Sequence, residues 1–267
     1  MTRSRRLEAR TVRLGHDASP VIDGLDLVIP PGQITVIIGA NASGKSTLLR
    51  GLARLLPVRR GDVLLDGASV SKMRSSDVAR AIGMLPQSPV APDGITVSDL
   101  VGRGRHPHQG WFRRWNNRDE EAVARALSAT ATAELSSRPV SDLSGGQRQR
   151  VWIAMALAQE TDILLLDEPT TFLDLNYQLE VLDLLAELNA TRGTTIVIVL
   201  HELNLAARYA HHLVAMRAGR IAAQGVPADV VTVETIREVF DLNCRIIDDP
   251  HTGSPMVVPV SSRSVSP

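Results

Sequence analysis

The chain has 267 residues, 44% of them hydrophobic, which suffices for one large domain or for one domain with a subdomain. Lysine plus arginine (29) equals aspartate plus glutamate (29), and the resulting net charge of zero argues against a nucleic-acid-binding surface spread over the whole molecule. A single cysteine, Cys244, excludes an internal disulfide and fits a reducing compartment.

The N-terminus, MTRSRRLEAR, is basic but lacks the apolar core of a signal peptide. No apolar run in the sequence reaches the roughly 18 residues that a membrane-spanning helix needs. We therefore expect a cytosolic protein that acts at a membrane only through a partner.

The first part of the chain predicts two strands, followed by a strand, a loop and a helix. Residues 7–14 and 21–29 have alternating or apolar patterns, with the turn-like GHDASP between them. The β-branched run QITVIIG at 33–39 is typical of a fully buried strand, and a glycine-bearing loop leads from it into KSTLLRGLARLL, which has helical spacing. This order predicts the opening of an α/β nucleotide-binding sheet.

The middle of the chain predicts a mostly helical subdomain inserted into the sheet domain. Two further short strands are expected at 63–65 and 81–85. Between about residues 88 and 160, proline, glycine and arginine are frequent, and helices are expected over 119–127 and 151–158.

Sheet-like sequence returns after this insertion. DILLLDE and TTIVIVLHE predict apolar strands that end in polar residues, and the leucine-rich segment 175–188 between them predicts a helix. From about Thr232 we expect a short helix and then a frayed end rich in proline and serine. The expected division is an antiparallel β subdomain with the first part of the nucleotide-binding core (1–87), the helical subdomain (88–160), the second part of the core (161–245) and a C-terminal tail (246–267).

The loop GANASGKS, residues 39–46, matches the pattern G-x-x-x-x-G-K-[ST] between a predicted strand and a predicted helix. In such a loop successive backbone N–H groups form an anion-binding nest, and the N-terminus of the helix adds its dipole. We expect Lys45 to reach the β- and γ-phosphates of a nucleotide and the Ser46 hydroxyl to ligate Mg²⁺.

Polar side chains follow three of the predicted strands. Asp167 and Glu168 end DILLLDE, where Asp167 fits a partner of Mg²⁺ and Glu168 a general base facing the attacking water. Gln87 and His201 stand in similar places after two other strands. Taken alone, a histidine or an amide there fits a structural role as well as a catalytic one.

The stretch LSGGQRQR, residues 143–150, precedes an apolar run that predicts a helix. Ser144 is a plausible N-cap, and the two glycines after it allow close approach of the backbone to a phosphate. We expect the helix to run from about Gln147 and to aim its positive end at that phosphate.

These pieces together resemble the ATP-binding cassette (ABC) ATPases. The ordered set GANASGKST, Gln87, LSGGQ, LLLDEP, FLD at 172–174 and His201 covers nearly the whole chain, and LSGGQ separates this family from other phosphate-loop ATPases. The resemblance implies an α/β fold with a RecA-like mixed sheet core, an antiparallel β subdomain and an inserted helical subdomain.

The resemblance also implies binding and hydrolysis of ATP with Mg²⁺. It assigns Mg²⁺ to Ser46, Gln87 and Asp167, and catalysis to Lys45, to Glu168 as the base and to His201 at the γ-phosphate. The residues that it implies in ATP binding are Gly39, Ala40, Asn41, Ala42, Ser43, Gly44, Lys45, Ser46, Thr47, His16, Gln87, Ser144, Gly145, Gly146, Gln147 and Asp174.

The sequence departs from the family pattern at four positions. Ala40 and Ala42 replace the common proline and glycine of the phosphate loop, and if position 42 needs a left-handed backbone, alanine costs roughly 1–2 kcal/mol there. His16 stands where the family usually has an aromatic residue that stacks on adenine, and both this role and that of an exposed turn residue stay open. Glu202 stands where aspartate is usual.

Several features indicate an importer subunit rather than another ABC protein. The chain has one cassette, no membrane segment, no long heptad region and no domain-sized C-terminal extension after the core. Particular stretches, among them GRGRHPHQGWFRRW and CRIIDDPHTGSPMVVP, resemble ATPases of ferric-siderophore uptake, including the ferric-enterobactin type. Importers of vitamin B12 or haem share much of this pattern, and a soluble ABC ATPase acting on protein or nucleic acid stays an alternative.

The resemblance implies a homodimer at the cytoplasmic face of a bacterial cell membrane. Its partners would be a two-subunit permease and, through the permease, a periplasmic or surface substrate-binding protein, without nucleic acid. The arginine-rich stretch 103–118 is interpreted as a docking or solvated face. The histidines 106, 108, 211 and 212 have no cysteine or acidic cluster with them, so a bound transition metal is not expected.

Overall fold

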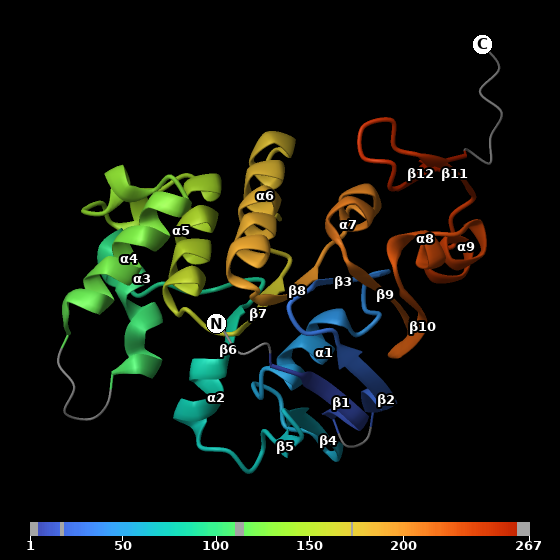
Figure 1. The fold of residues 1–267 in the computed structure, drawn as a ribbon, viewed down its shortest axis with the longest axis horizontal. Helices are drawn as coiled ribbons and strands as arrows, with labels where there is room; N and C mark the ends of the chain where they lie inside the picture. Colours follow the sequence, from blue (N-terminus) through green and yellow to red (C-terminus); the bar gives the residue numbers. More distant parts are fainter. Residues whose placement is uncertain (1–4, 17–18, 110–114, 172, 261–267) are drawn as a thin grey trace. The chain divides into compact units, whose positions relative to one another are not determined.

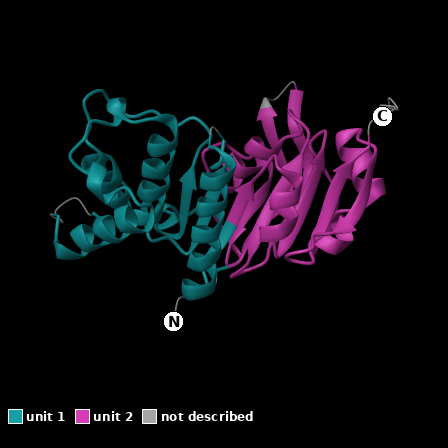
Figure 2. Cartoon of the chain, turned by 90° about the horizontal axis from the view of Figure 1, so that it is seen from above, with its two compact units in different colours: residues 1–5, 72–196 teal, residues 6–71, 197–267 magenta. Residues whose placement is uncertain are grey.

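A computed structural model of the chain describes residues 5–16, 19–109, 115–171 and 173–260 (Figure 1). The chain forms two compact units, which Figure 2 colours separately. Unit 1 comprises residues 1–5 and 72–196, and unit 2 comprises residues 6–71 and 197–267. No helix in the described part of the chain combines the length and apolar character needed to cross a lipid bilayer.

Unit 2 contains the expected antiparallel β sheet. Its strands, in the order β2-β1-β4-β5, are β2 (Ser19–Ile29), β1 (Leu7–His16), β4 (Arg60–Leu65) and β5 (Ala68–Ser69). Alternate residues of β2 turn inward, so that Leu25, Leu27 and Ile29 are buried while their neighbours are exposed. Helix α1 (Lys45–Leu52) packs against β1 and gives this sheet its apolar cover.

A second, mixed sheet in unit 2 carries the phosphate loop. The buried strand β3 (Ile34–Gly39) pairs in parallel with β9 (His212–Arg217), which pairs antiparallel with β10 (Arg220–Gly225). On the other side of β3 follows β8 (Thr195–Val199), and Leu200 just after it donates from its backbone N–H to Ile37 O at 3.2 Å. The expected buried strands at the loop and before His201 are therefore present.

Residues 244–259 correct our expectation of a frayed tail over 246–267, of which 261–267 lie outside the described residues. After α7 (Leu203–Tyr209), α8 (Pro227–Val230) and α9 (Val233–Phe240), the chain forms an antiparallel hairpin of β11 (Cys244–Asp248) and β12 (Pro255–Pro259). Prolines lie only at the two ends of β12, where they leave its central pairing intact. The expectation rested on the proline and serine content of this segment, which does not show which residues pair as strands.

Within its described residues, unit 1 contains the three expected helices, which extend beyond the predicted segments 119–127, 151–158 and 175–188, and two short helices that the sequence analysis did not assign. Their bounds are α2 (Ser75–Ala81), α3 (Val97–Gly102), α4 (Asn117–Ala129), α5 (Gly145–Ala158) and α6 (Leu175–Arg192), and short 3-10 turns span Arg103–His108, Ala133–Leu135 and Val140–Asp142. Capping sets the limits, because Asn116 and Asp119 form a capping box at the start of α4 and Gly193, with φ 66°, ends α6. Helices α3, α4 and α5 pack side by side (Figure 1).

Unit 1 also holds two parallel strands, β6 (Ile82–Leu85) and β7 (Ile163–Asp167). Leu85 lies opposite Leu166, so the carboxyl ends of the two strands meet at one edge. The strand expected from Ala81 begins one residue later, because Ala81 ends α2.

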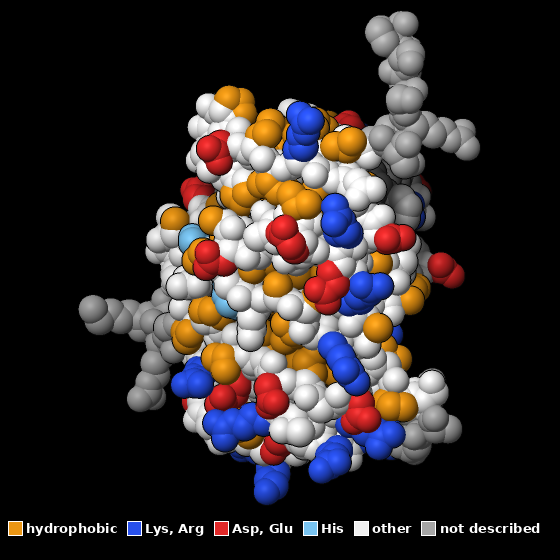
Figure 3. Space-filling model, turned by 90° about the vertical axis from the view of Figure 1, so that its right-hand side faces the viewer, with side chains coloured by type: hydrophobic (Ala, Val, Ile, Leu, Met, Phe, Trp, Pro, Cys, Tyr) orange, Lys and Arg blue, Asp and Glu red, His pale blue; other side chains and the backbone are white. Residues whose placement is uncertain are grey.

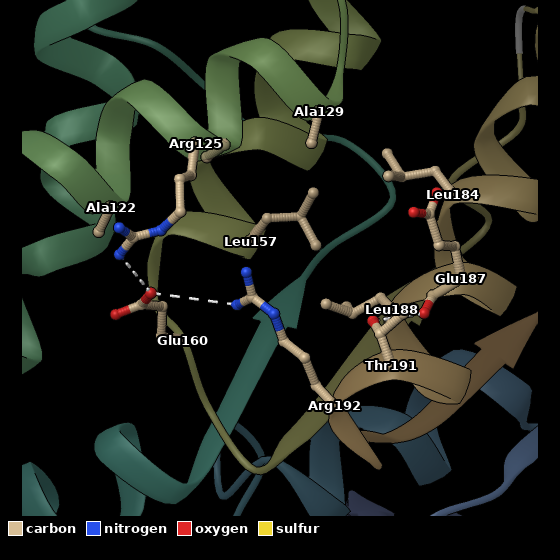
Figure 4. A pocket seen from close by; sticks show the side chains of 11 residues that line it. Ala122, Arg125, Ala129, Leu157, Glu160, Leu184, Glu187, Leu188, Thr191 and Arg192 are labelled. Carbon is tan, nitrogen blue, oxygen red and sulfur yellow. Dashed lines mark hydrogen bonds and ion pairs between the residues drawn. The ribbon is translucent and has the colours of Figure 1, made fainter.

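Within the stretch 103–118, interpreted as a docking or solvated face, Arg103 and Arg118 are exposed but Arg105 is buried. Arg105 is 5% exposed and donates to Asp119 Oδ1 at 3.1 Å, to Ala158 O at 2.7 Å and to Glu160 Oε2 at 3.0 Å. In Figure 4, Arg125 also points to Glu160, and their nitrogen and oxygen atoms lie 3.0 Å apart. This network ties the 3-10 turn to α4 and α5, whereas residues 110–114 lie outside the described residues.

The surface carries charges of both signs. On the face drawn in Figure 3, basic and acidic side chains are interspersed among hydrophobic and neutral ones. This mixture agrees with the equal numbers of acidic and basic residues in the sequence.

Candidate nucleotide-binding site

The phosphate loop joins β3 to α1 through two glycines that no other residue replaces without a clash or strain. A Cβ atom on Gly39 would lie 2.4 Å from Met216 O and 2.7 Å from Ser43 Oγ. Gly44, the N-cap of α1, has φ 101°, a conformation that side chains disfavour. The loop therefore packs closely against β9 and makes the tight turn that its sequence pattern predicts.

Ala42 has the left-handed backbone conformation in which alanine is strained. Its φ is 60°, in the left-handed region, where a Cβ atom costs roughly 1–2 kcal/mol. Ala40, the other departure from the family pattern, is not among the residues with positive φ. Only one of the two alanines therefore places a strained backbone in the loop.

The loop contains groups suited to a phosphate. Lys45 is buried, and its Nζ donates to Gly39 O at 2.8 Å and to Ala40 O at 3.0 Å. The Ser43 hydroxyl is buried and has no hydrogen-bond partner within the described residues. A buried donor without a partner is costly, and an anion bound in the loop would accept from it. The loop therefore fits a phosphate group.

Asp167 ends β7 in unit 1, and Glu168 follows it directly. Asp167 is 3% exposed and Glu168 is 8% exposed. Glu168 has φ 52°, so the chain turns in a left-handed conformation at this residue. Both carboxylates stand at the carboxyl end of a parallel strand, where ligands of α/β sheets bind.

Gln87 lies beside Glu168, as the meeting of β6 and β7 requires. Its Nε2 donates to Glu168 Oε2 at 2.6 Å, and Thr171 Oγ1 donates to the same oxygen at 3.3 Å. The structure therefore brings Gln87 and Glu168 together, and it adds Thr171, which our sequence reasoning missed. A threonine three residues after a carboxylate gave no separate signal.

The LSGGQRQR stretch starts helix α5 earlier than expected, at Gly145 rather than near Gln147. Ser144 is the N-cap, and it forms a capping box with Gln147: Ser144 Oγ accepts from Gln147 N at 3.3 Å, and Gln147 Oε1 accepts from Ser144 N at 3.1 Å. Ser144 and Gly145 are exposed, and a Cβ on Gly145 would meet no atom within 4 Å. The positive end of α5 is therefore open on this side.

The segment after Glu168 is tied to this helix. Gln149 Nε2 donates to Pro169 O at 2.7 Å, a contact that sequence reasoning missed although Gln149 lies within the quoted stretch. Further along, Asp174 is the N-cap of α6 and accepts from Tyr177 N at 3.1 Å. Phe172, part of FLD, lies outside the described residues.

The histidines at positions 16, 201 and 211 have separate places in unit 2. His201 is exposed and lies between β8 and α7. His16 ends β1, and its side chain lies outside the described residues, so its stacking on adenine stays a prediction. His211 Nδ1 accepts from the backbone N–H of Ile34 at 3.1 Å. Across the described ranges, no group of three or more His, Cys, Asp or Glu side chains could hold a metal ion.

Comparison with known proteins identifies the family. Residues 22–171 match the ABC transporter family. The chain belongs to the ABC transporter family. It is 54% identical to the "Probable siderophore transport system ATP-binding protein YusV" of Bacillus subtilis, over 95% of this chain and 92% of that protein. It is 51% identical to the ferric enterobactin transport ATP-binding protein FepC of Escherichia coli, over 98% of this chain and 96% of that protein.

Solved structures of the family have the same fold. A transporter assigned to the metal-chelate type of ABC transporter, in an inward-facing conformation, matches with a TM-score of 0.82 and 27% identity over 97% of this chain and 98% of that chain. The cassette MJ0796, a dimer in a post-hydrolysis state bound to ADP and Pi, matches with a TM-score of 0.74 and 25% identity over 82% of this chain and 98% of that chain. These matches confirm that this chain has the ABC-cassette fold and is an ATPase of this family.

Proposed function

We propose that the protein is the ATP-binding and ATP-hydrolysing subunit of an importer for ferric siderophores. The cargo assignment rests on sequence identity. The chain is 51–54% identical, over at least 95% of its length, to ATP-binding proteins named for siderophore, petrobactin, achromobactin and ferric enterobactin transport. The alternative cargo, cobalamin, has weaker support, since the cobalamin import ATP-binding protein BtuD of Halobacterium salinarum is 38% identical and only 61% of it is covered. Neither the phosphate loop nor the carboxylates discriminate between these cargoes.

The reaction is the attack of water on the γ-phosphate of ATP, giving ADP and phosphate. In this proposal the loop 39–47 binds the phosphates, with Lys45 compensating their charge, and Glu168 takes the proton from the water. The contacts of Gln87 and Thr171 with Glu168 support this role, because they orient its carboxylate. His201 contacts the γ-phosphate.

Mg²⁺ would be held by Ser46, Asp167 and the side-chain oxygen of Gln87. Hydroxyl, carboxylate and amide oxygens are hard ligands of the kind that Mg²⁺ prefers. Since the amide nitrogen of Gln87 faces Glu168, its oxygen remains for the ion. When bound, Mg²⁺ neutralises charge on the β- and γ-phosphates.

The exposed start of α5 supports a homodimer as the working unit. Ser144 and Gly145 present a helix N-terminus to the surface, and we propose that they contact the γ-phosphate bound by the other subunit. Gly146 and Gln147 complete this signature, and Asp174 lies in the loop that links the two ATP sites. ATP then favours the closed dimer, because only that state offers the γ-phosphate both sets of contacts.

The remaining partners follow from the importer assignment. The dimer would bind a two-subunit permease at the cytoplasmic face of the membrane, and a substrate-binding protein would deliver the cargo from the other side. Co-purification from membranes tests this assignment. Recovery with a multi-helix permease supports it, whereas recovery with ribosomes or DNA supports a soluble ABC ATPase instead.

Substitution of Glu168 by glutamine tests the catalytic assignment. We expect Glu168→Gln to bind ATP, to hydrolyse it roughly 10²–10⁴-fold more slowly and to accumulate as an ATP-bound dimer, because the amide does not act as a base. Dimerisation is measured by analytical ultracentrifugation with and without MgATP. Turnover at the wild-type rate would remove Glu168 from the role of base.

Lys45→Ala tests the phosphate loop independently. This variant should lose tight ATP binding in calorimetry, since the charge opposite the phosphates is absent. An unchanged affinity would contradict the proposed loop function. For the cargo, growth of a deletion strain on single iron sources is decisive, because normal growth on every ferric siderophore would exclude this class.

A further inference from the structure

We infer that the C-terminal hairpin, formed by β11 and β12, positions His201 by clamping helix α7. The inference rests on the proposed role of His201 at the γ-phosphate. It assigns the task to Asn204 and Arg208, two residues of α7 that contact the hairpin and act on His201 through the helix.

Helix α7 depends on its surroundings for stability. It spans only Leu203–Tyr209, and its N-cap, Glu202, makes no side-chain capping hydrogen bond. Helices shorter than about 12 residues are marginal in water without tertiary contacts. Because His201 lies two residues before this helix, its position depends on what holds α7.

The inner side of α7 is held by β3, the strand that leads to the phosphate loop. Ala206 and Ala207 are buried, and the helix packs against β3. After the helix, His211 and Ile34 exchange two hydrogen bonds, His211 N to Ile34 O at 2.9 Å and Ile34 N to His211 Nδ1 at 3.1 Å. These contacts fix the far end of the helix, but they leave its outer side to another partner.

The hairpin is the partner of the outer side, as Figure 1 shows for α7 and β12. The amide of Asn204 pairs with both backbone groups of Val257: Asn204 Oδ1 accepts from Val257 N at 2.8 Å, and Asn204 Nδ2 donates to Val257 O at 3.3 Å. This pairing replaces the contacts of a third strand. Since an isolated two-stranded hairpin is marginally stable, the helix and the hairpin stabilise each other.

A second contact lies one turn further along the same face of the helix. Arg208 Nη2 donates to Asp249 Oδ2 at 3.0 Å, and Arg208 is four residues after Asn204. The backbone N–H groups of His251 and Thr252 donate to Asp249 Oδ1 at 2.8 Å and 3.2 Å. With Arg208 they lower the pKa of Asp249 to about 2, so this carboxylate is charged and oriented at neutral pH.

Two contacts on one face of a short helix fix its rotation as well as its position. Loss of either contact lets α7 rotate or fray, and either motion displaces His201. Small displacements of a group that contacts the reacting phosphate are costly, since a shift of about 1 Å lowers a rate by up to roughly 10²-fold. Binding of ATP by the loop 39–47 does not depend on this helix rotation.

The test compares Asn204→Ala, Asn204→Asp and Asn204→Gln in the full chain, with Arg245→Ala, an exposed arginine of the same hairpin, as the control. Asn204→Ala and Asn204→Asp should lower kcat for ATP roughly tenfold or more with little change in KM, because each removes the donor to Val257 O. The ring signals of His201 in NMR, assigned by their loss in His201→Ala, should shift in both variants and stay unchanged in the control. Asn204→Gln keeps both hydrogen-bonding groups and should therefore retain a higher kcat than Asn204→Ala and Asn204→Asp.

A conservative change at Arg208 guards against variants that merely fail to fold. Arg208→Ala should lower kcat and shift the His201 signals, whereas Arg208→Lys, which keeps a positive charge opposite Asp249, should retain more of kcat and leave the signals closer to those of the wild type. Wild-type kcat and unshifted His201 signals in the Asn204 variants and in Arg208→Ala, or equal losses in folded Arg208→Lys and Arg208→Ala, would overturn the inference. If His201→Ala hydrolyses ATP at the wild-type rate, the proposed role of His201 is wrong. If His201→Ala loses hydrolysis while the variants of α7 keep it, the role of His201 stands and the proposed role of the hairpin is wrong.

Discussion

Gln87 donates a hydrogen bond from its amide nitrogen to Glu168 Oε2 over 2.6 Å, across the carboxyl ends of the parallel strands β6 and β7. The contact joins Gln87, which the resemblance assigns to Mg²⁺ and ATP binding, to Glu168, which it assigns to catalysis. Because the amide is neutral, the contact orients the carboxylate without forming an ion pair that would compete with water for it.

Removal of the amide should therefore slow hydrolysis more than it weakens binding. We expect Gln87→Ala to lower kcat about tenfold, a loss of about 1.4 kcal/mol in transition-state stabilisation, with little change in KM. Thr171→Val, which removes the longer contact of 3.3 Å, should have a smaller effect. Steady-state ATPase rates of both variants check this order of effects. Equal losses of kcat in the two variants, or a wild-type rate for Gln87→Ala, would contradict it.

Ala42 offers a stabilising substitution in the phosphate loop. Its φ of 60° favours glycine, so Ala42→Gly should raise the free energy of unfolding by about 1 kcal/mol, although the greater freedom of glycine in the unfolded chain offsets part of the gain. Thermal unfolding should then occur roughly 2–4 °C higher.

Two further variants serve as controls for this backbone effect. Gly44→Ala should destabilise the protein, since Gly44 has φ 101°. Ala40→Gly should give no gain, because Ala40 has no positive φ. A decrease in stability for Ala42→Gly would show that the alanine is not strained there.

The Arg105 network predicts unequal effects of two arginines. Arg105 pairs with Asp119, and their side chains are 6% and 1% exposed, so Arg105→Leu leaves a buried carboxylate without its partner and should cost about 3–5 kcal/mol. Arg125 is 50% exposed where it pairs with Glu160, and Arg125→Leu should cost less than about 1 kcal/mol. Urea unfolding measures both, and similar losses would contradict the burial argument.

His212 should make stability depend on pH. Burial lowers its pKa below the ordinary value of 6.5, although a hydrogen bond with Gln224 opposes this shift. The unfolded chain therefore binds a proton at a higher pH than the folded chain, and this part of the unfolding free energy is complete above about pH 6.5 and decreases as the pH falls toward the folded pKa.

Urea unfolding at pH 7.5 and pH 5 measures this dependence. His212→Gln should lose less stability than the wild type over this interval. Identical pH dependence of the two proteins would show that His212 does not contribute to it.

The sequence by itself determined the nucleotide chemistry of this protein. A buried strand, a glycine loop and a helix follow one another at 34–52, and carboxylates follow another buried strand at 167–168. These features are local, because strand periodicity, glycine conformations and helix caps depend on neighbouring residues. They predicted an α/β nucleotide-binding sheet with its phosphate loop, whereas the resemblance to the family predicted the ABC-cassette fold.

Only the tertiary structure decided which distant side chains meet. Arg105, in a stretch that reads as solvated, is buried against Asp119 and Glu160, and the proline-bearing end of the chain is a hairpin bound to Asn204. These partners are separated by 14 to 55 residues in the sequence. Strand register and the need of buried polar groups for hydrogen bonds determine which of them meet. Local patterns do not encode these choices, because each side chain has many possible partners until the whole unit packs.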